Sequence, residues 1–232
     1  GDMGSLTLDN GVGGHGIGSI DDKTPTANEE IWDNINHGTG HDGFRAGIGN
    51  AGAIAYSTTL GGLSVSADYV RQGGGTLEDG VTGGGGSGSS HSVAVTTSVS
   101  DGMSIGAGYA SLGTTNASED LDQMTAFVTY AVGPISAGAQ VAHEGGATSA
   151  DWNTYQWGIS FNVSDNIAVG YGQRTVDFGD GSVIVDQEDS GISASYTMGS
   201  MSIKGNMNKT DDLKGTSGSD LETTEIAVSF AF

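Results

Sequence analysis

Apolar and polar residues alternate along most of the chain, and the pattern is clearest at its end. There the apolar residues Ile226, Val228, Phe230 and Phe232 alternate with the small or polar residues Glu225, Ala227, Ser229 and Ala231. A period of two predicts a β-strand with one apolar face. Because chain ends usually fray in water, an apolar strand in this position indicates an apolar environment. The lipid bilayer is the leading candidate.

From about residue 51 onward, the alternation divides the chain into strands of roughly 8 to 11 residues. The clearest strands span residues 63–69, 124–130, 155–163 and 192–198, and their second face consists mostly of Ser, Thr, Gly, Asn and Gln. A soluble β-sandwich could carry the same pattern. The period by itself therefore fits a β-sandwich and a membrane barrel equally well.

The connections between the strands distinguish these two architectures. Short turns are expected at 60–62, 100–102, 133–134, 164–166 and 199–200, and long polar loops at 72–90, 112–121, 144–153, 176–188 and 209–221. Because the two kinds alternate strictly, all short turns lie at one end of the strands and all long loops at the other. Outer-membrane barrels have this arrangement, whereas a Greek-key sandwich mixes connection lengths at both ends.

The tyrosines support the barrel. All seven are in phase with the apolar face of their strand, and several lie near strand ends: Tyr56, Tyr69, Tyr109, Tyr130, Tyr155, Tyr171 and Tyr196. Amphipathic rings at those positions would meet the lipid headgroups. Tyrosine favours strands in general, but that preference does not account for a shared phase at all seven positions.

Composition excludes several classes of protein. The 232 residues contain no Cys, 42 Gly, 7 basic and 28 acidic residues, for a formal net charge of −21. A nucleic-acid partner is not expected, because phosphate binding needs clustered Lys and Arg. No apolar run approaches the ~18 residues of a membrane helix, and disulfide scaffolds are excluded. No secretory signal peptide is present, so we expect that it has been cleaved or that the sequence starts downstream of it.

The first fifty residues differ from the rest. Residues 3–9 read as one strand, and about forty residues without clear alternation follow. A stretch of that length in a compact domain is usually functional or disordered. Residues 26–35 could form a short helix, with Thr26 as N-cap and Glu29 in a capping box.

Taken together, the chain resembles the general porins of Gram-negative bacteria, and most closely the Rhodobacter-type porins. The resemblance spans essentially the whole sequence and is carried by residues 1–9, the acidic stretch after them, the hairpin at 53–69 and the terminal Phe232. It implies an all-β, antiparallel transmembrane barrel of the sixteen-stranded type in one domain, 1–232, with residues 10–50 as an inward-folded constriction loop. It also implies that Phe230 and Phe232 act as a signal for the outer-membrane assembly machinery.

One departure from the family is the strand count. About twelve strands are predicted, starting from a segment that resembles the family's fifth strand, so we expect a porin that lacks its first strands. A complete barrel of about twelve strands remains the alternative, since even counts from about 8 upward occur.

The mechanism expected of such a barrel is a water-filled opening with charges at its narrowest point. The constriction is expected to carry Asp21, Asp22, Glu29, Glu30, Asp33 and Arg45, and the lumen wall Asp68, Gln140, Gln156, Arg174, Lys204 and Glu225. An acidic loop opposite a basic wall would produce a transverse field, and the acid excess predicts a weak preference for cations. The competing interpretation of residues 21–33 is a solvated external loop.

Metal sites and catalysis have weaker signals. Asp21, Asp22 and Glu29 could bind Ca²⁺, which takes several oxygen ligands; no cofactor is otherwise required. His37 and His41 are four residues apart, but Gly38 and Gly40 disfavour the helix that a zinc site would need. No nucleophile and base occur in a recognisable arrangement, so we do not expect an enzyme.

The function expected is passive diffusion of small polar solutes and ions across the outer membrane of a Gram-negative bacterium. The partners expected are the lipid bilayer, lipopolysaccharide, two further copies in a homotrimer, and the assembly machinery. The alternatives are an outer-membrane adhesin or structural barrel, or a complete smaller barrel without an open channel. A calcium-dependent β-roll is disfavoured, because the nine-residue glycine–aspartate repeat is absent.

Overall fold

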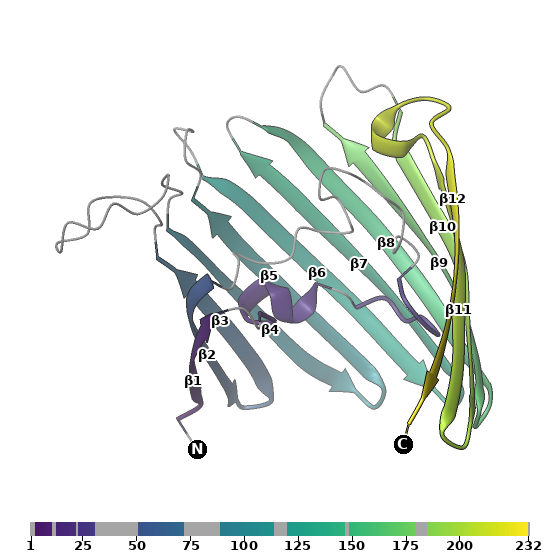
Figure 1. Cartoon of the computed structure of the whole chain (residues 1–232). Coiled ribbons are helices and arrows are strands. Elements are labelled where there is room, and N and C mark those ends of the chain that lie inside the picture. Colours follow the sequence, from purple (N-terminus) through teal and green to yellow (C-terminus); the bar gives the residue numbers. More distant parts are fainter. Residues whose placement is uncertain are drawn as a thin grey trace.

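A computed structural model describes residues 3–10, 13–21, 23–30, 51–71, 89–113, 120–146, 149–179 and 185–231. These residues form one antiparallel sheet of twelve strands in which each strand pairs with its neighbours in the sequence (Figure 1). The strands are β1 (Ser5–Asn10), β2 (Ala51–Leu60), β3 (Leu63–Val70), β4 (Ser90–Ser100), β5 (Met103–Leu112), β6 (Leu121–Val132), β7 (Ile135–Gly146), β8 (Ser149–Ser164), β9 (Ile167–Phe178), β10 (Gln187–Met198), β11 (Met201–Asp211) and β12 (Leu221–Phe230). The predicted fold class and strand count are confirmed.

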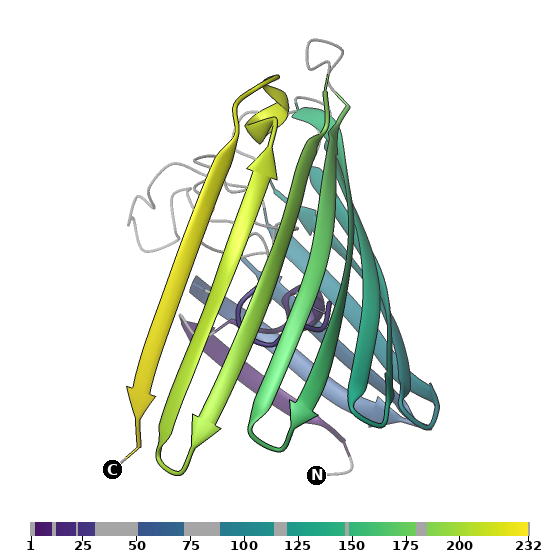
Figure 2. The same cartoon turned by 90° about the vertical axis from the view of Figure 1, so that its right-hand side faces the viewer.

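The sheet is strongly curved, with β1 and β12 at its two edges (Figures 1 and 2). Two-residue turns at 61–62, 101–102, 133–134, 165–166 and 199–200 all lie at one end of the strands, which is the lower end in Figure 1. The first turn uses glycine for its backbone, because Gly61 and Gly62 have φ values of +57° and +89°. The predicted short turns are therefore confirmed.

The prediction of a long loop at 144–153 is wrong. Strand β7 continues to Gly146 and β8 begins at Ser149. Cross-strand contacts extend the sheet here: Gln123 Nε2 donates to Glu144 Oε2 at 2.7 Å, and His143 Nδ1 lies 3.0 Å from Asn153 Oδ1. The neighbouring connections are also shorter than expected, at 113–120, 179–186 and 212–220.

The two faces of the sheet have opposite character. Trp157, Phe161 and Val228 face away from the concave side and are 43%, 40% and 53% exposed. The tyrosines share this outer face: Tyr171, for example, pairs with Ile159 and Ile192. The concave face carries buried polar residues instead: Gln123, Thr125, Gln140, Gln156, Arg174, Asp189 and Asn206. A water-soluble protein would show the reverse arrangement.

No helix among the described residues has the length and hydropathy needed to cross a bilayer.

A segment between β1 and β2 lies on the concave side of the sheet (Figures 1 and 2). Its described parts, residues 13–21 and 23–30, are called the inner segment below. It contains the 3-10 helix η1 (Gly16–Ile20) and then runs without regular structure to residue 30.

The helix expected over residues 26–35 is not present in its described part, 26–30. The Thr26 hydroxyl donates to the Glu29 carbonyl at 2.9 Å, so it does not form the predicted capping box with the Glu29 amide. Residues 31–35 lie outside the described part of the chain.

Candidate functional site

The first end of the inner segment is held by two serines of the wall. The Gly16 amide donates to Ser66 Oγ at 2.9 Å, and the Ile17 amide donates to Ser92 Oγ at 2.8 Å. The Ser92 hydroxyl in turn donates to the buried Asp68 carboxylate. Asp68 therefore orients Ser92, which holds the start of η1.

Apolar packing adds to these hydrogen bonds. Ile17 and Ile20 are fully buried on the concave face. Ile17 packs with Ala110, while Ile20 packs with Ala94 and Phe127. Burying a side chain of this size contributes roughly 1.5–3 kcal/mol, so η1 is attached to β4, β5 and β6 by a small apolar cluster of its own.

Gln140 binds the middle of the inner segment through both the nitrogen and the oxygen of its side-chain amide. Its Nε2 donates to the Ile20 carbonyl at 2.8 Å, and its Oε1 accepts from the Lys23 amide at 3.0 Å. Gln156 Nε2 donates to the same Oε1 at 3.2 Å. Both glutamines face the concave side and are buried.

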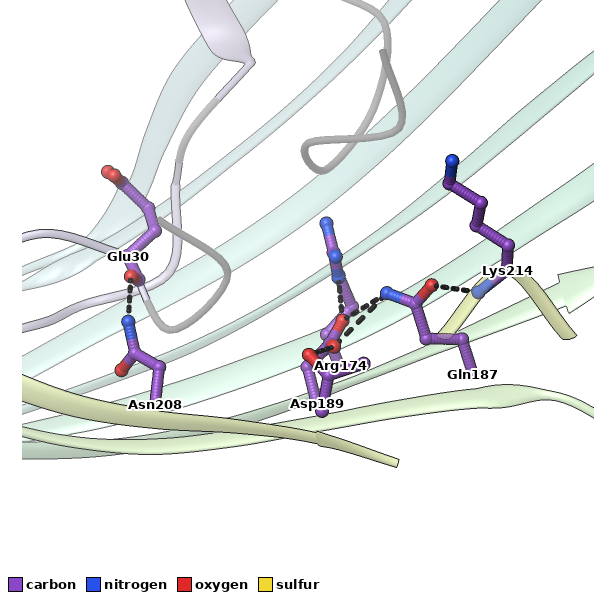
Figure 3. Close-up of polar contacts among 7 residues, drawn as sticks. Glu30, Arg174, Gln187, Asp189, Asn208 and Lys214 are labelled. Atoms are coloured by element: carbon purple, nitrogen blue, oxygen red, sulfur yellow. Dashed lines mark hydrogen bonds and ion pairs between the residues drawn. The ribbon is translucent and has the colours of Figure 1, made fainter. Parts of the chain in front are cut away.

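The far end of the inner segment reaches β10 and β11. The Ala27 amide donates to Ser193 Oγ at 3.0 Å. Asn208 Nδ2 points at the Glu30 carbonyl and donates to it at 3.4 Å (Figure 3). The segment thus crosses the concave face from β3 to β11.

A buried ion pair lies beside this crossing. Arg174 Nε is 2.6 Å from Asp189 Oδ2, and both side chains are fully shielded from solvent. Gln187 Nε2 donates to both Asp189 oxygens at 3.1 Å, while its Oε1 accepts from the Lys214 amide at 2.9 Å (Figure 3). Lys214 belongs to the short helix η2 (Leu213–Gly215), so this network ties the connection between β11 and β12 to the wall.

The sequence prediction missed Asp189, Gln187, Ser92 and Ser193. Alternation along β10 places Gln187, Asp189 and Ser193 on its polar face, and that signal was available in the sequence. The pairing of Arg174 with Asp189 was not, because it depends on the register between the strands.

The remaining predicted site residues are placed as follows. Lys204 and Glu225 lie on the concave face of β11 and β12, where Lys204 pairs with Ala227 and Glu225 with Asn206. Asp21 and Glu30 are half-buried, Glu29 is exposed, and Phe230 is exposed on the outer face at the end of β12. The predicted site residues Asp22, Asp33, Arg45 and Phe232, together with His37 and His41, lie outside the described residues.

A cavity of about 820 Å³ lies between the inner segment and strands β1 to β6. Most of its lining residues are serines and threonines: Ser5, Ser19, Ser57, Thr58, Thr59, Ser64, Ser66, Thr96, Ser104 and Thr129. Lys23 contributes a cation to this lining. Ile20, Val65 and Phe127 add apolar surface, so hydroxyl and apolar groups are mixed on this side of the inner segment.

The residues suggested for calcium are only partly described. Asp21 and Glu29 lie on the inner segment, and Asp22 is outside the described residues. Within the described ranges no group of three or more His, Asp or Glu side chains is placed to hold a metal ion. The described residues therefore do not form a complete calcium site by themselves.

Comparison with known proteins gives one family. A family model described as Gram-negative porin matches residues 2–232. A search of curated protein sequences finds no match.

Several solved structures share the fold. An anion-selective porin from Comamonas acidovorans has 16% sequence identity and a TM-score of 0.62, over 78% of this chain and 60% of that one. A porin refined at 1.8 Å has 17% identity and a TM-score of 0.69, over 100% of this chain and 79% of that one. A variant of the Rh. blastica porin has 16% identity and a TM-score of 0.53, over 79% and 69%. At such identities these structures show the fold alone, and Rhodobacter-type porins are among them, as predicted.

Proposed function

The chain belongs to the Gram-negative porin family of non-enzymatic outer-membrane channels, and from that premise we propose how this chain conducts. The concave face lines a water-filled path for small polar solutes and ions, and the inner segment, part of residues 10–50, narrows that path. The observation that carries the proposal is the inverted character of the two faces. Buried Gln, Asn, Ser, Thr and Arg line the inside, while Trp, Phe, Ile and Val cover the outside.

Planar-bilayer recording tests this proposal against an adhesin or a closed structural barrel. The purified chain should produce stepwise increases in current, because each inserted water-filled channel conducts ions. A membrane that stays electrically silent after insertion of folded protein would support a structural role instead.

We propose that the channel weakly prefers cations. The net charge of −21 supports this, as does the pairing of Arg174 with Asp189, which balances the buried cation of the described wall. Exposed Glu29 adds negative charge to the inner segment. Lys23 and Lys204 act in the opposite direction, and a porin of the same fold is named anion-selective, so the fold by itself does not determine the sign.

The reversal potential across a KCl gradient measures this preference directly. We expect a potential of the sign that cation-preferring channels give, and a larger one at low ionic strength, where charges are screened less. An anion-type potential would contradict the proposal.

Porins are typically trimeric in the outer membrane, and we propose a homotrimer in contact with lipopolysaccharide for this chain. Phe230, exposed at the end of β12, and Phe232 are the proposed recognition point for the assembly machinery. Outer-face residues Ala137 and Ala139 are compatible with a subunit contact and with lipid. Cross-linking in intact outer membranes should give a species of three chains.

Calcium at Asp21, Asp22 and Glu29 stays a prediction. If a calcium ion bridges these carboxylates, the thermal unfolding midpoint should rise with CaCl₂ and fall again with a chelator, while MgCl₂ at equal ionic strength serves as the control. Equal unfolding midpoints in all three conditions would show that calcium does not bind at these carboxylates.

A further inference from the structure

Four strand glycines touch the inner segment at points where a side chain would not fit. They come from four different strands and are called the glycine seat below: Gly108 of β5, Gly138 of β7, Gly158 of β8 and Gly170 of β9.

The contacts of the glycine seat are made with consecutive parts of the inner segment. A Cβ atom at Gly108 would lie 2.9 Å from Ile17 Cγ1, and one at Gly138 would lie 2.8 Å from Pro25 Cδ. A Cβ at Gly158 would be 2.5 Å from the Pro25 carbonyl oxygen. One at Gly170 would be 2.8 Å from the Ala27 nitrogen and 2.7 Å from Oγ of Ser193, the wall serine that accepts from the Ala27 amide. Separations below 3.0 Å essentially never occur for real Cβ atoms.

Backbone conformation does not explain these glycines. None of the four has a φ in the left-handed region, since the positive-φ glycines of the described chain lie elsewhere. Glycine inside a strand is otherwise unfavourable, by roughly 0.5–1 kcal/mol relative to Ala. Such a glycine often marks close approach of another backbone, and here the approaching chain is the inner segment.

The hydrogen bonds between wall and segment are directed mainly at the segment's main chain. Wall oxygens accept from the amides of Gly16, Ile17, Lys23 and Ala27. Wall amides donate to the carbonyls of Ile20 and Glu30. This recognition does not depend on the side chains of Lys23 and Glu29.

We propose that the glycine seat and these main-chain hydrogen bonds set how far the inner segment stands into the lumen, while the segment's charged side chains influence ion preference and leave the width unchanged. Width and selectivity are then controlled by separate residues. The inference rests on the proposed channel function and adds the wall residues that position the constriction.

Gly158→Ala is the cleanest test, because the nearest atoms to its Cβ all belong to the inner segment. Ordinary van der Waals contacts of a Cβ begin at 3.4 Å, whereas the Pro25 carbonyl oxygen would be 2.5 Å away. The segment must therefore move toward the lumen axis to relieve the overlap. The single-channel current step in 1 M KCl, called the step below, should become smaller with Gly158→Ala and smaller again with Gly158→Val. Charges are screened within about 3 Å at this salt concentration, so the step reports geometry.

The matched control is Ser160→Thr. Ser160 lies on the same strand and face, two residues closer to the short turn, and the substitution likewise adds one methyl group. Its step should equal that of the unchanged chain. Equal steps for Gly158→Ala and Ser160→Thr would overturn the proposal.

A double-mutant cycle covers the case in which Gly158→Ala does not fold. The Gly138 contact is made with the Pro25 ring, so Pro25→Ala should partly restore the step lost in Gly138→Ala. The restoration is partial because a Cβ at Gly138 also lies 3.1 Å from Thr129 Cγ2. Additive effects of the two substitutions would contradict the assigned contact.

Lys23→Glu tests the other half of the proposal. It should shift the reversal potential at low salt toward cations and leave the step in 1 M KCl unchanged. A changed step without a changed potential would refute the separation of roles. If the unchanged chain gives no steps at all, the channel function fails, and that outcome is distinct from every result above.

Discussion

At the scale of single residues, Asp189 offsets the positive charge of the buried Arg174. Its carboxylate contacts Arg174 and accepts hydrogen bonds from Gln187 and Thr210, and all of these groups are buried. Breaking a buried pair leaves an uncompensated charge, which is costlier than losing an exposed pair. Because the carboxylate of Asp189 lies against the Arg174 guanidinium, the pair contributes little net field to the lumen.

Asp189→Asn should shift the reversal potential toward anions, because it removes one negative charge from the concave wall. It should also destabilise the folded chain by about 3 kcal/mol, as expected for a broken buried ion pair. The reversal potential and the guanidinium unfolding midpoint in detergent measure the two effects.

Asp211→Asn is the matched control for this change. Asp211 forms an ion pair with Lys209 in which both side chains are about half exposed, at 41% and 48%. Exposed pairs contribute little, so neither readout should change measurably. A similar response from both variants would mean that the Arg174–Asp189 pair has no special influence on the lumen.

At the scale of elements, the inner segment depends on the wall for its structure. The described part has one short 3-10 helix, and side chains from β3, β4, β7, β10 and β11 bind its main chain. A short segment is marginal in isolation. Its fixed path across the concave face therefore comes from tertiary contacts.

Gln140→Leu should loosen the middle of the inner segment. The change removes the hydrogen bonds to the Ile20 carbonyl and the Lys23 amide, each worth about 1 kcal/mol. We expect more current noise in the open channel, since the segment samples more positions.

Gln173→Leu provides the comparison on the outer face. Gln173 donates to the Tyr171 hydroxyl at 2.9 Å and is exposed there. Its replacement should leave open-channel noise as it was. Equal noise in both variants would argue that Gln140 does not restrain the segment.

At the scale of the whole molecule, the sheet separates two solvents. Adjacent residues of one strand face lipid and water in turn, so the same substitution should have opposite consequences at neighbouring positions. Ile159 lies on the outer face of β8, and Ser160 lies on the concave face.

Ile159→Arg should destabilise the membrane-inserted chain by about 2–4 kcal/mol if the position is near the bilayer midplane, and by less near the interface. Ser160→Arg should cost far less, because water can solvate the guanidinium, and it should shift ion preference toward anions. Unfolding from lipid vesicles gives the stabilities. An equal cost at both positions would show that the concave face is not in contact with water.

The local sequence pattern was sufficient to predict much of this protein's fold. The pleat of a strand makes every second side chain face the same way, so the sequence alone predicted that Gln140, Gln156 and Arg174 share a polar face and that Trp157 and Phe161 share an apolar one. Turn composition and spacing predicted which connections are short. The resemblance to porins followed from the order of these features and is confirmed by the family match.

Other features depend on residues far apart in the chain. The loop expected at 144–153 is paired strand, because Gln123, Asn153 and their partners meet only once the strands are in register. Thr26 was expected to cap a helix, but it lies against Ser193, 167 residues away.

Sequence by itself therefore determined which face each strand residue belongs to, because that is decided by the local pleat. Tertiary structure alone decided the pairing of Arg174 with Asp189, the place of the inner segment and the close approach of Gly158 to Pro25, because register and chain crossing bring these groups together across long stretches of sequence.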